Sequence, residues 1–209
     1  MFRLFFIGLD LLVCTVILVP LCRVLNSRMM EKRGQTERIL YVIFAVYLIS
    51  VFSATGLPAS NSVTWDPSFH LIPFLGMANS PVSYIEGCIL NIILFVPMGI
   101  LLPLLWKEFR ELKYTALFGL SFSLGIELLQ VFTLRLTDVD DLITNTLGTV
   151  VGYWIAKIII SLFKIKFGQG KGRCRKELLA VIVLSSLVWF LFSPFVGIIY
   201  MIMYGVSFI

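Results

Sequence analysis

Apolar residues fill six long segments of the chain, and shorter polar connectors separate them. A helix that crosses the roughly 30 Å hydrocarbon core of a bilayer needs about 20 such residues. The pattern therefore predicts an all-α, polytopic helical membrane protein with six transmembrane helices. These helices are expected near residues 3–22, 39–57, 86–106, 114–134, 141–163 and 177–204.

The composition supports this interpretation. The 209 residues are 59% hydrophobic and 14% charged. A soluble domain of this size would have to bury almost all of those apolar side chains, which is far from the composition of globular proteins. We therefore expect residues 1–209 to form a single integral membrane domain.

The basic residues predict the orientation of the helices. Of the 17 Lys and Arg residues, 14 lie in the connectors that follow the first, third and fifth segments. Cytoplasmic connectors of membrane proteins are enriched in these residues, so both chain termini are expected outside. The net charge of +5 then reflects topology, and no nucleic-acid partner is expected. An alternative role for the same clusters is binding of anionic lipid headgroups.

One stretch, from Gly125 to Gly152, carries polar residues into two neighbouring apolar segments. Glu127 and Gln130 lie in the fourth segment, and Asn145 lies in the fifth. Polar side chains at membrane depth are costly, so they usually have partners and often have a function. At a rise of about 1.5 Å per residue, Glu127, Asn145 and Asn91 of the third segment lie in the outer half of the bilayer.

Helical spacing predicts that these side chains converge. Ser123, Glu127 and Gln130 share one face of the fourth helix, and Asp141 and Asn145 share one face of the fifth. We expect Glu127, Gln130 and Asn145 to meet Asn91 of the third helix in a polar crevice that opens outward. A charged rim is expected above it, formed by Glu86, Arg135, Asp138, Asp140 and Asp141. Small residues on the fifth helix would let another backbone approach closely, and these are Thr144, Gly148, Gly152 and Ala156.

Each polar residue also has a structural interpretation. Asn91 and Asn145 are explained as well by hydrogen bonds between helices as by a function. Asp138 is suited to cap the N-terminus of the fifth helix, and Arg135 and Asp141 can form a simple salt bridge at the rim. Glu127 favours a function, because an ionisable group at that depth is hard to explain as a contact between helices.

No cofactor or metal site is expected. Asp138, Asp140 and Asp141 can offer oxygens to a divalent cation, but their spacing matches no dedicated calcium loop. His70 is the single histidine, and a lone histidine is more often structural than catalytic. The sequence contains no phosphate-binding glycine loop and no nucleophile elbow.

Four stretches between about residues 70 and 155 form a recognisable series: LIPF (71–74), NIILFVPMGILLPLL (91–105), IELLQ (126–130) and RLTDVDDLITNTLGTVVG (135–152). Together they resemble the VanZ-like family of bacterial membrane proteins. The resemblance implies a multi-pass protein of the bacterial plasma membrane that is associated with resistance to glycopeptide antibiotics, teicoplanin above all. It implies no catalytic residue or reaction. It does give importance to the matching positions, which are Asn91, Pro97, Gly99, Glu127, Gln130, Arg135, Asp138, Asp141, Asn145 and Gly148.

Three functions are open at this point. The first is a binding or shielding protein, whose crevice holds a membrane lipid, a lipid-linked cell-wall precursor or the acyl tail of a lipoglycopeptide. The second is an intramembrane enzyme that modifies a lipid headgroup, with Glu127 as general base, Arg135 as anion clamp and Asp141 orienting Arg135. The third is a small transporter, which is least favoured because the polar residues stop in the outer half and the helices show no repeat. The ligand and the oligomeric state stay open.

Overall fold

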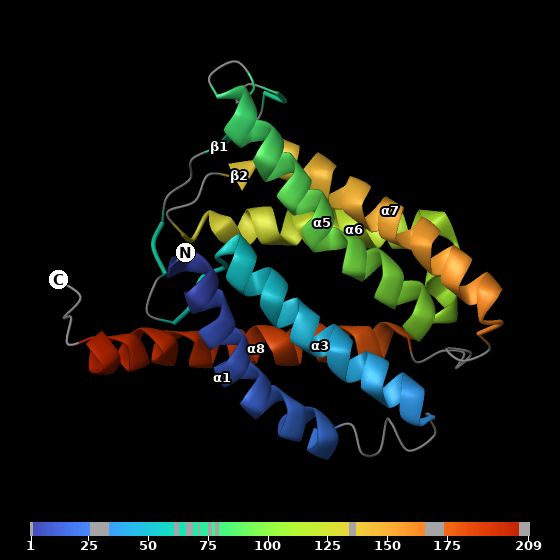
Figure 1. Ribbon diagram of the computed structural model, residues 1–209, viewed down its shortest axis with the longest axis horizontal. Coiled ribbons are helices and arrows are strands. Elements are labelled where there is room, and N and C mark those ends of the chain that lie inside the picture. The colour runs from blue at the N-terminus through green and yellow to red at the C-terminus, as the bar shows by residue number, and fades with distance from the viewer. Residues whose placement is uncertain are drawn as a thin grey trace. The chain divides into compact units, whose positions relative to one another are not determined.

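The computed structural model describes residues 2–25, 34–60, 63–65, 69–70, 72–74, 77, 80–133, 137–165 and 174–204. Most of these residues are in six α-helices, and a 3-10 turn, η1 (Lys107–Arg110), joins two of them. The all-α prediction with six long helices is confirmed. The helices, shown in Figure 1, are α1 (Phe2–Leu25), α3 (Gln35–Thr55), α5 (Pro81–Leu105), α6 (Leu112–Gln130), α7 (Val139–Leu162) and α8 (Cys174–Tyr204).

Five helices are long and apolar enough to cross a membrane: α3, α5, α6, α7 and the Arg175–Pro194 part of α8. In α1, the residues with described side chains include a shorter apolar run, Leu11–Leu21. These lengths and compositions agree with a polytopic helical membrane protein. The orientation of the helices, with both termini outside, stays a prediction of the charge pattern.

Two of the helix ends that differ from the predicted ones have a local explanation. Helix α5 begins at Pro81, before the expected start at residue 86, because proline suits the first position of a helix, where its missing N–H is not needed. Helix α6 ends at Gln130, although the predicted segment continues to residue 134. The chain turns there, and the Thr133 hydroxyl donates a hydrogen bond to the Gln130 carbonyl oxygen at 2.8 Å.

The chain divides into two compact units, which we call the terminal unit (Met1–Val63 with Arg175–Ile209) and the middle unit (Thr64–Cys174). In the terminal unit, the Tyr41 hydroxyl of α3 donates to the Glu177 carbonyl oxygen of α8 at 3.1 Å. Ser185 of α8 donates to the Ala45 carbonyl oxygen of α3 at 3.4 Å. A single membrane domain over residues 1–209 stays a prediction.

The middle unit is built on a close contact between α5 and α7. A methyl group added to Gly99 of α5 would lie 2.9 Å from Gly152 Cα and would collide with the Thr149 carbonyl oxygen of α7. A methyl group added to Gly148 of α7 would lie 3.0 Å from Ile92 Cα of α5. These glycines therefore let the two backbones touch, as small residues do between membrane helices. The structure confirms the predicted close approach at Gly148 and Gly152 of α7, and the helix that approaches them is α5.

A short parallel strand pair attaches the segment before α5 to the turn between α6 and α7. Strand β1 (Phe69–His70) pairs with strand β2 (Thr137–Asp138), with Phe69 opposite Thr137 and His70 opposite Asp138. Upstream, the Thr64 N–H donates to the Phe132 carbonyl oxygen at 3.0 Å. The rings of Trp65 and Phe132 lie 5.4 Å apart. The parts of residues 64–70 that the structure describes are thus anchored to the α6–α7 turn.

Candidate functional site

Polar residues gather where α6 ends and α7 begins, in the middle unit. The side chains of Glu127, Gln130 and Asn145 are each 3% exposed, and that of Asp140 is 5% exposed. They are therefore covered by protein and do not face lipid. Because buried polar groups need hydrogen-bond partners, the partners of each side chain show what it does in the fold.

Glu127 of α6 holds the start of α7. Its Oε2 accepts a hydrogen bond from the Asp138 backbone N–H at 2.9 Å. Asp138 is the N-cap of α7, and its Oδ1 accepts from the Asp140 N–H at 2.9 Å. The capping role predicted for Asp138 is confirmed. Glu127 consequently has a structural contact in addition to whatever function it serves.

Asp140 binds the segment that precedes α5. The Phe74 N–H lies 3.0 Å from one carboxylate oxygen of Asp140 and 3.2 Å from the other. Phe74 has a φ of 64°, a left-handed backbone that residues other than glycine rarely adopt. Tyr84 of α5 also lies close enough to interact with the Asp140 carboxylate. A buried acid therefore fixes an unfavourable backbone conformation at the end of the LIPF stretch.

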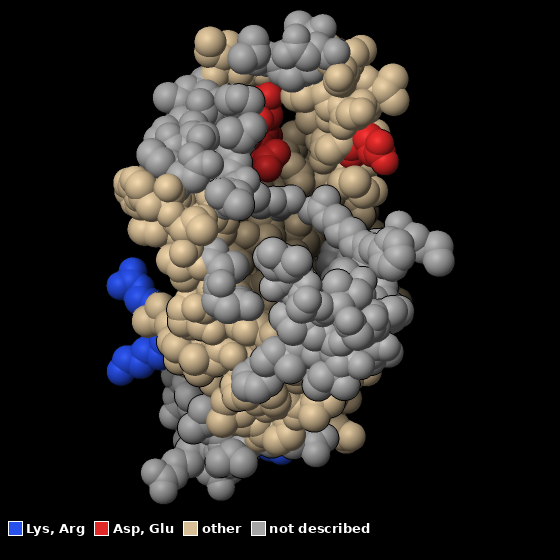
Figure 2. All heavy atoms as spheres, turned by 90° about the vertical axis from the view of Figure 1, so that its left-hand side faces the viewer, with Lys and Arg blue, Asp and Glu red and all other residues tan. Residues whose placement is uncertain are grey.

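Asn91 and Asp141 connect α5 to α7. The Asn91 Nδ2 donates to Asp141 Oδ1 at 2.7 Å. A hydrogen bond of this length with an ionised acceptor is among the stronger ones in proteins. Both side chains are partly exposed, so this pair lies closer to the surface than Asn145. Figure 2 shows acidic side chains set back in a hollow of the molecular surface.

Asn145 connects α7 to α6. Its Nδ2 donates to the Ser123 hydroxyl oxygen at 2.9 Å. Its Oδ1 is buried and has no hydrogen-bond partner among the residues that the structure describes. One turn further along α7, Thr149 packs against Gly119 of α6, which leaves no room for a side chain at Gly119. Asn145 thus lies in a tightly packed contact with one acceptor still to be satisfied.

The structure brings the described members of the predicted group toward one end of three helices and gives several of them separate partners. Their described hydrogen bonds join Asn91 to Asp141, Asn145 to Ser123, and Glu127 to the backbone of Asp138. The outward-opening crevice itself stays a prediction. Arg135 lies outside the described residues, so its salt bridge with Asp141 and its role as an anion clamp also stay predictions.

The sequence predicts Asp140 in the charged rim and offers it as an oxygen donor to a cation, but it does not reveal the contact with Phe74. The sequence signal for this contact is the LIPF stretch, which ends at Phe74, but the stretch is interpreted only as part of the family resemblance. His70 contributes its backbone to the pairing of β1 with β2. Within the described ranges, no three His, Cys, Asp or Glu side chains are grouped so that they could hold a metal ion.

Comparison with known proteins points to one family. The sequence model described as VanZ/LLP1 matches residues 38–161, which is more than half of the chain and includes the stretches singled out between residues 70 and 155. "Protein VanZ" of Enterococcus faecium is 38% identical over 86 residues, which are 41% of this chain and 50% of that protein. The chain thus spans about half the length of this curated relative. No solved structure matches the chain significantly.

Proposed function

Because the chain belongs to the VanZ/LLP1 family, we propose that it modulates the action of glycopeptide antibiotics of the teicoplanin type at the bacterial plasma membrane. It does so by binding or shielding an amphiphile at the polar end of α5, α6 and α7. The amphiphile is a lipid-linked cell-wall component or the lipoglycopeptide itself. The link to glycopeptides rests on the family resemblance, and the place of binding rests on the site.

The observation that carries the proposal is the open acceptor of Asn145. Its Oδ1 is buried without a hydrogen-bond partner among the described residues. An unpaired buried acceptor costs about 1–3 kcal/mol, so a donor that reaches it gains binding energy. Asn91 and Asp141 lie nearer the surface, hydrogen-bond to each other and offer the headgroup further polar contacts. Because Asn145 is 3% exposed, the headgroup has to displace neighbouring side chains to reach it.

The chemistry of the site favours a headgroup rich in hydrogen-bond donors. Its side chains are mainly acceptors: the carboxylates of Asp138 and Asp141, which are partly exposed, and the amide oxygen of Asn145. Hydroxyl, amide and ammonium groups donate to such oxygens. Sugars and peptides carry hydroxyl and amide donors, as do the headgroups of cell-wall precursors and the bodies of lipoglycopeptides. The apolar tail of the amphiphile would remain in the bilayer.

The alternative of an intramembrane enzyme has weaker support. A general base needs a carboxylate oxygen directed at a substrate proton, whereas Oε2 of Glu127 accepts the Asp138 N–H. Arg135 lies outside the described residues, so the enzyme remains the competing hypothesis that the following experiment addresses.

One experiment separates the two functions. Bacteria carrying the wild-type chain, the Asn145→Leu variant or the Glu127→Gln variant are compared with cells carrying an empty vector. Teicoplanin susceptibility and the composition of the lipid extract are measured in each. A Ser121→Ala variant is the control, because Ser121 is exposed and its hydroxyl donates to the Leu117 carbonyl oxygen within the same helix.

Binding predicts that the wild-type chain and Ser121→Ala lower teicoplanin susceptibility while the lipid extract stays unchanged, and that Asn145→Leu loses the protection. A new lipid species that disappears with Glu127→Gln would establish the enzyme in its place. Equal susceptibility in all strains would reject a role in glycopeptide action.

A further inference from the structure

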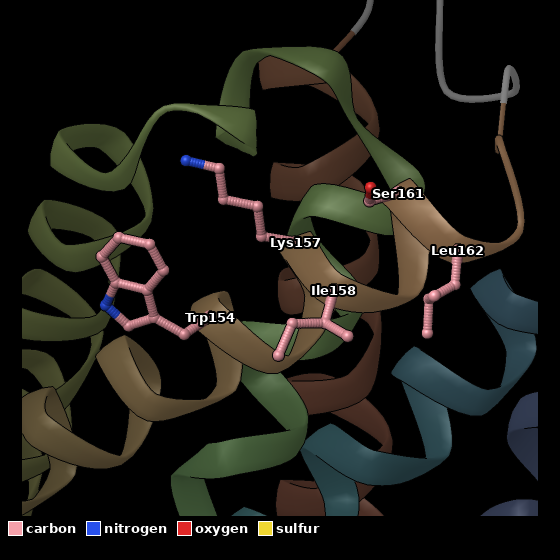
Figure 3. Close-up of a pocket in the computed structure, with 5 residues that line it drawn as sticks. All are labelled: Trp154, Lys157, Ile158, Ser161 and Leu162. Atoms are coloured by element: carbon pink, nitrogen blue, oxygen red, sulfur yellow. The ribbon is translucent and has the colours of Figure 1, made fainter.

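The exposed face at the end of α7 contains a pocket of about 370 Å³. Figure 3 shows the five residues that line it, Trp154, Lys157, Ile158, Ser161 and Leu162. They lie within the last turns of the helix, far from the polar site: Lys157 is 12 residues after Asn145, or about 18 Å along the helix axis. We infer that this pocket binds an anionic phospholipid of the surrounding bilayer, with Lys157 on the phosphate and the apolar residues on an acyl chain.

The pocket joins polar and apolar groups on one face of the helix. Residues spaced by three or four positions lie on the same side, which brings Trp154, Ile158 and Leu162 into one apolar row. Their side chains are 50%, 59% and 72% exposed. In a helix that crosses a membrane, such a row is covered by lipid chains. Lys157 and Ser161 flank the row with an ammonium group and a hydroxyl, which are the groups that a phosphate accepts hydrogen bonds from.

Lys157 is the single basic residue of α7, and its ammonium group can bind an anionic ligand. Its Nζ lies 5.1 Å from the centre of the Trp154 ring, in a cation–π contact that holds the ammonium beside the pocket. Among the described residues, no acidic side chain forms an ion pair with Lys157. Lys113 provides a contrast, since it also lies over an aromatic ring, Tyr114, at 4.7 Å, but pairs with Glu111 at 3.2 Å.

The predicted orientation places this pocket at the inner leaflet. Helix α7 ends at Leu162, and the basic connector that follows it is expected in the cytoplasm. The inner leaflet carries the negative surface potential that attracts lysine and arginine near the membrane. Tryptophan is enriched at the same depth, where its ring meets both headgroups and tails. Charge and depth together therefore favour an anionic phospholipid over a soluble phosphate.

The test uses the full-length chain in detergent micelles, titrated with single phospholipids. Binding of phosphatidylglycerol and of phosphatidylcholine is measured by native mass spectrometry for the wild type and the Lys157→Gln, Lys157→Arg and Trp154→Leu variants. Inorganic phosphate is added as a competitor in a separate arm. Lys113→Gln is the matched control, because it removes an equal charge beside an aromatic ring without touching the pocket.

We expect the wild type to prefer phosphatidylglycerol. Lys157→Gln lowers that affinity about fivefold, the effect of one basic residue near an anionic surface, and leaves phosphatidylcholine unchanged. Lys157→Arg retains the preference, Trp154→Leu weakens binding of both lipids, and Lys113→Gln behaves like the wild type. Equal binding of the two lipids by the wild type, or equal losses for Lys157→Gln and Lys113→Gln, would overturn the assignment. Full competition by inorganic phosphate would show an anion site instead of a lipid site.

Discussion

The carboxylate of Asp140 holds the Phe74 N–H between its two oxygens, at 3.0 and 3.2 Å. This hydrogen bond joins the start of α7 to a residue 66 positions earlier in the chain. It also stabilises a left-handed backbone at Phe74, a residue that is 61% exposed. The acid therefore determines how an aromatic side chain before α5 is presented to its surroundings.

Asp140→Ala is expected to destabilise the middle unit. The Phe74 N–H loses a charged acceptor, and a hydrogen bond of that kind contributes about 1.5–3 kcal/mol. The free energy of unfolding in detergent should fall by about that amount. Glu108→Ala is the control, because Glu108 is an exposed acid of η1 with no comparable contact among the described residues. If both variants unfold alike, the Phe74 contact contributes nothing to stability.

Gly99→Ala is expected to separate α5 from α7. The added methyl group would lie 2.9 Å from Gly152 Cα and would collide with the Thr149 carbonyl oxygen, both of which are backbone atoms that cannot rotate away. Overpacking of this kind costs about 1–3 kcal/mol or more, and thermal unfolding in detergent would measure it.

Gly87→Ala is the matched control for that change, since Gly87 lies in the same helix and has no atom within 4 Å of an added methyl group. Alanine there should be neutral or slightly stabilising, because it has the higher helix propensity. A Gly99→Ala variant as stable as Gly87→Ala would contradict the close α5–α7 contact.

Two substitutions at Glu127 distinguish its structural contact from its charge. Glu127→Gln keeps an oxygen that can accept the Asp138 N–H, whereas Glu127→Ala removes it. We expect Glu127→Gln to unfold close to the wild type and Glu127→Ala to be less stable by about 1–3 kcal/mol. Circular dichroism during heating gives both values. The reverse order, with Glu127→Gln the less stable, would mean that the charge and not the backbone contact holds the site.

Much of the architecture follows from the sequence because each helix is a long apolar run. The ends are less predictable, since the first turn of α5 from Pro81 is more polar than the run it precedes and α6 is ended by a local turn at Thr133. The sequence predicts that another helix approaches closely at Gly148 and Gly152, because small residues recur every four positions there. Their partner helix could not be deduced from spacing alone.

The polar site was predictable as a group but not in its pairs. Helical periodicity places Ser123 and Glu127 on one face of α6 and Asn145 on one face of α7, and the Asn145–Ser123 hydrogen bond agrees with that placement. The contact between Asp140 and Phe74 depends on how a connector folds back over the α6–α7 turn. Such contacts between distant segments have no periodic signal in the sequence.

The affinity of the reconstituted protein for teicoplanin, compared between the wild type and Asn145→Leu, tests the central claim most directly. Leucine removes the open acceptor Oδ1 and keeps the number of side-chain heavy atoms, although its methyl groups are bulkier. The lost hydrogen bond with the buried Ser123 hydroxyl costs about 1–3 kcal/mol, so circular dichroism is used to verify that the variant remains folded. If a ligand donor binds Asn145, the substitution weakens teicoplanin binding about tenfold in a protein that remains folded. If teicoplanin binds both proteins equally, or neither, the lipoglycopeptide does not bind at Asn145, and the proposal that the site takes the antibiotic itself is wrong.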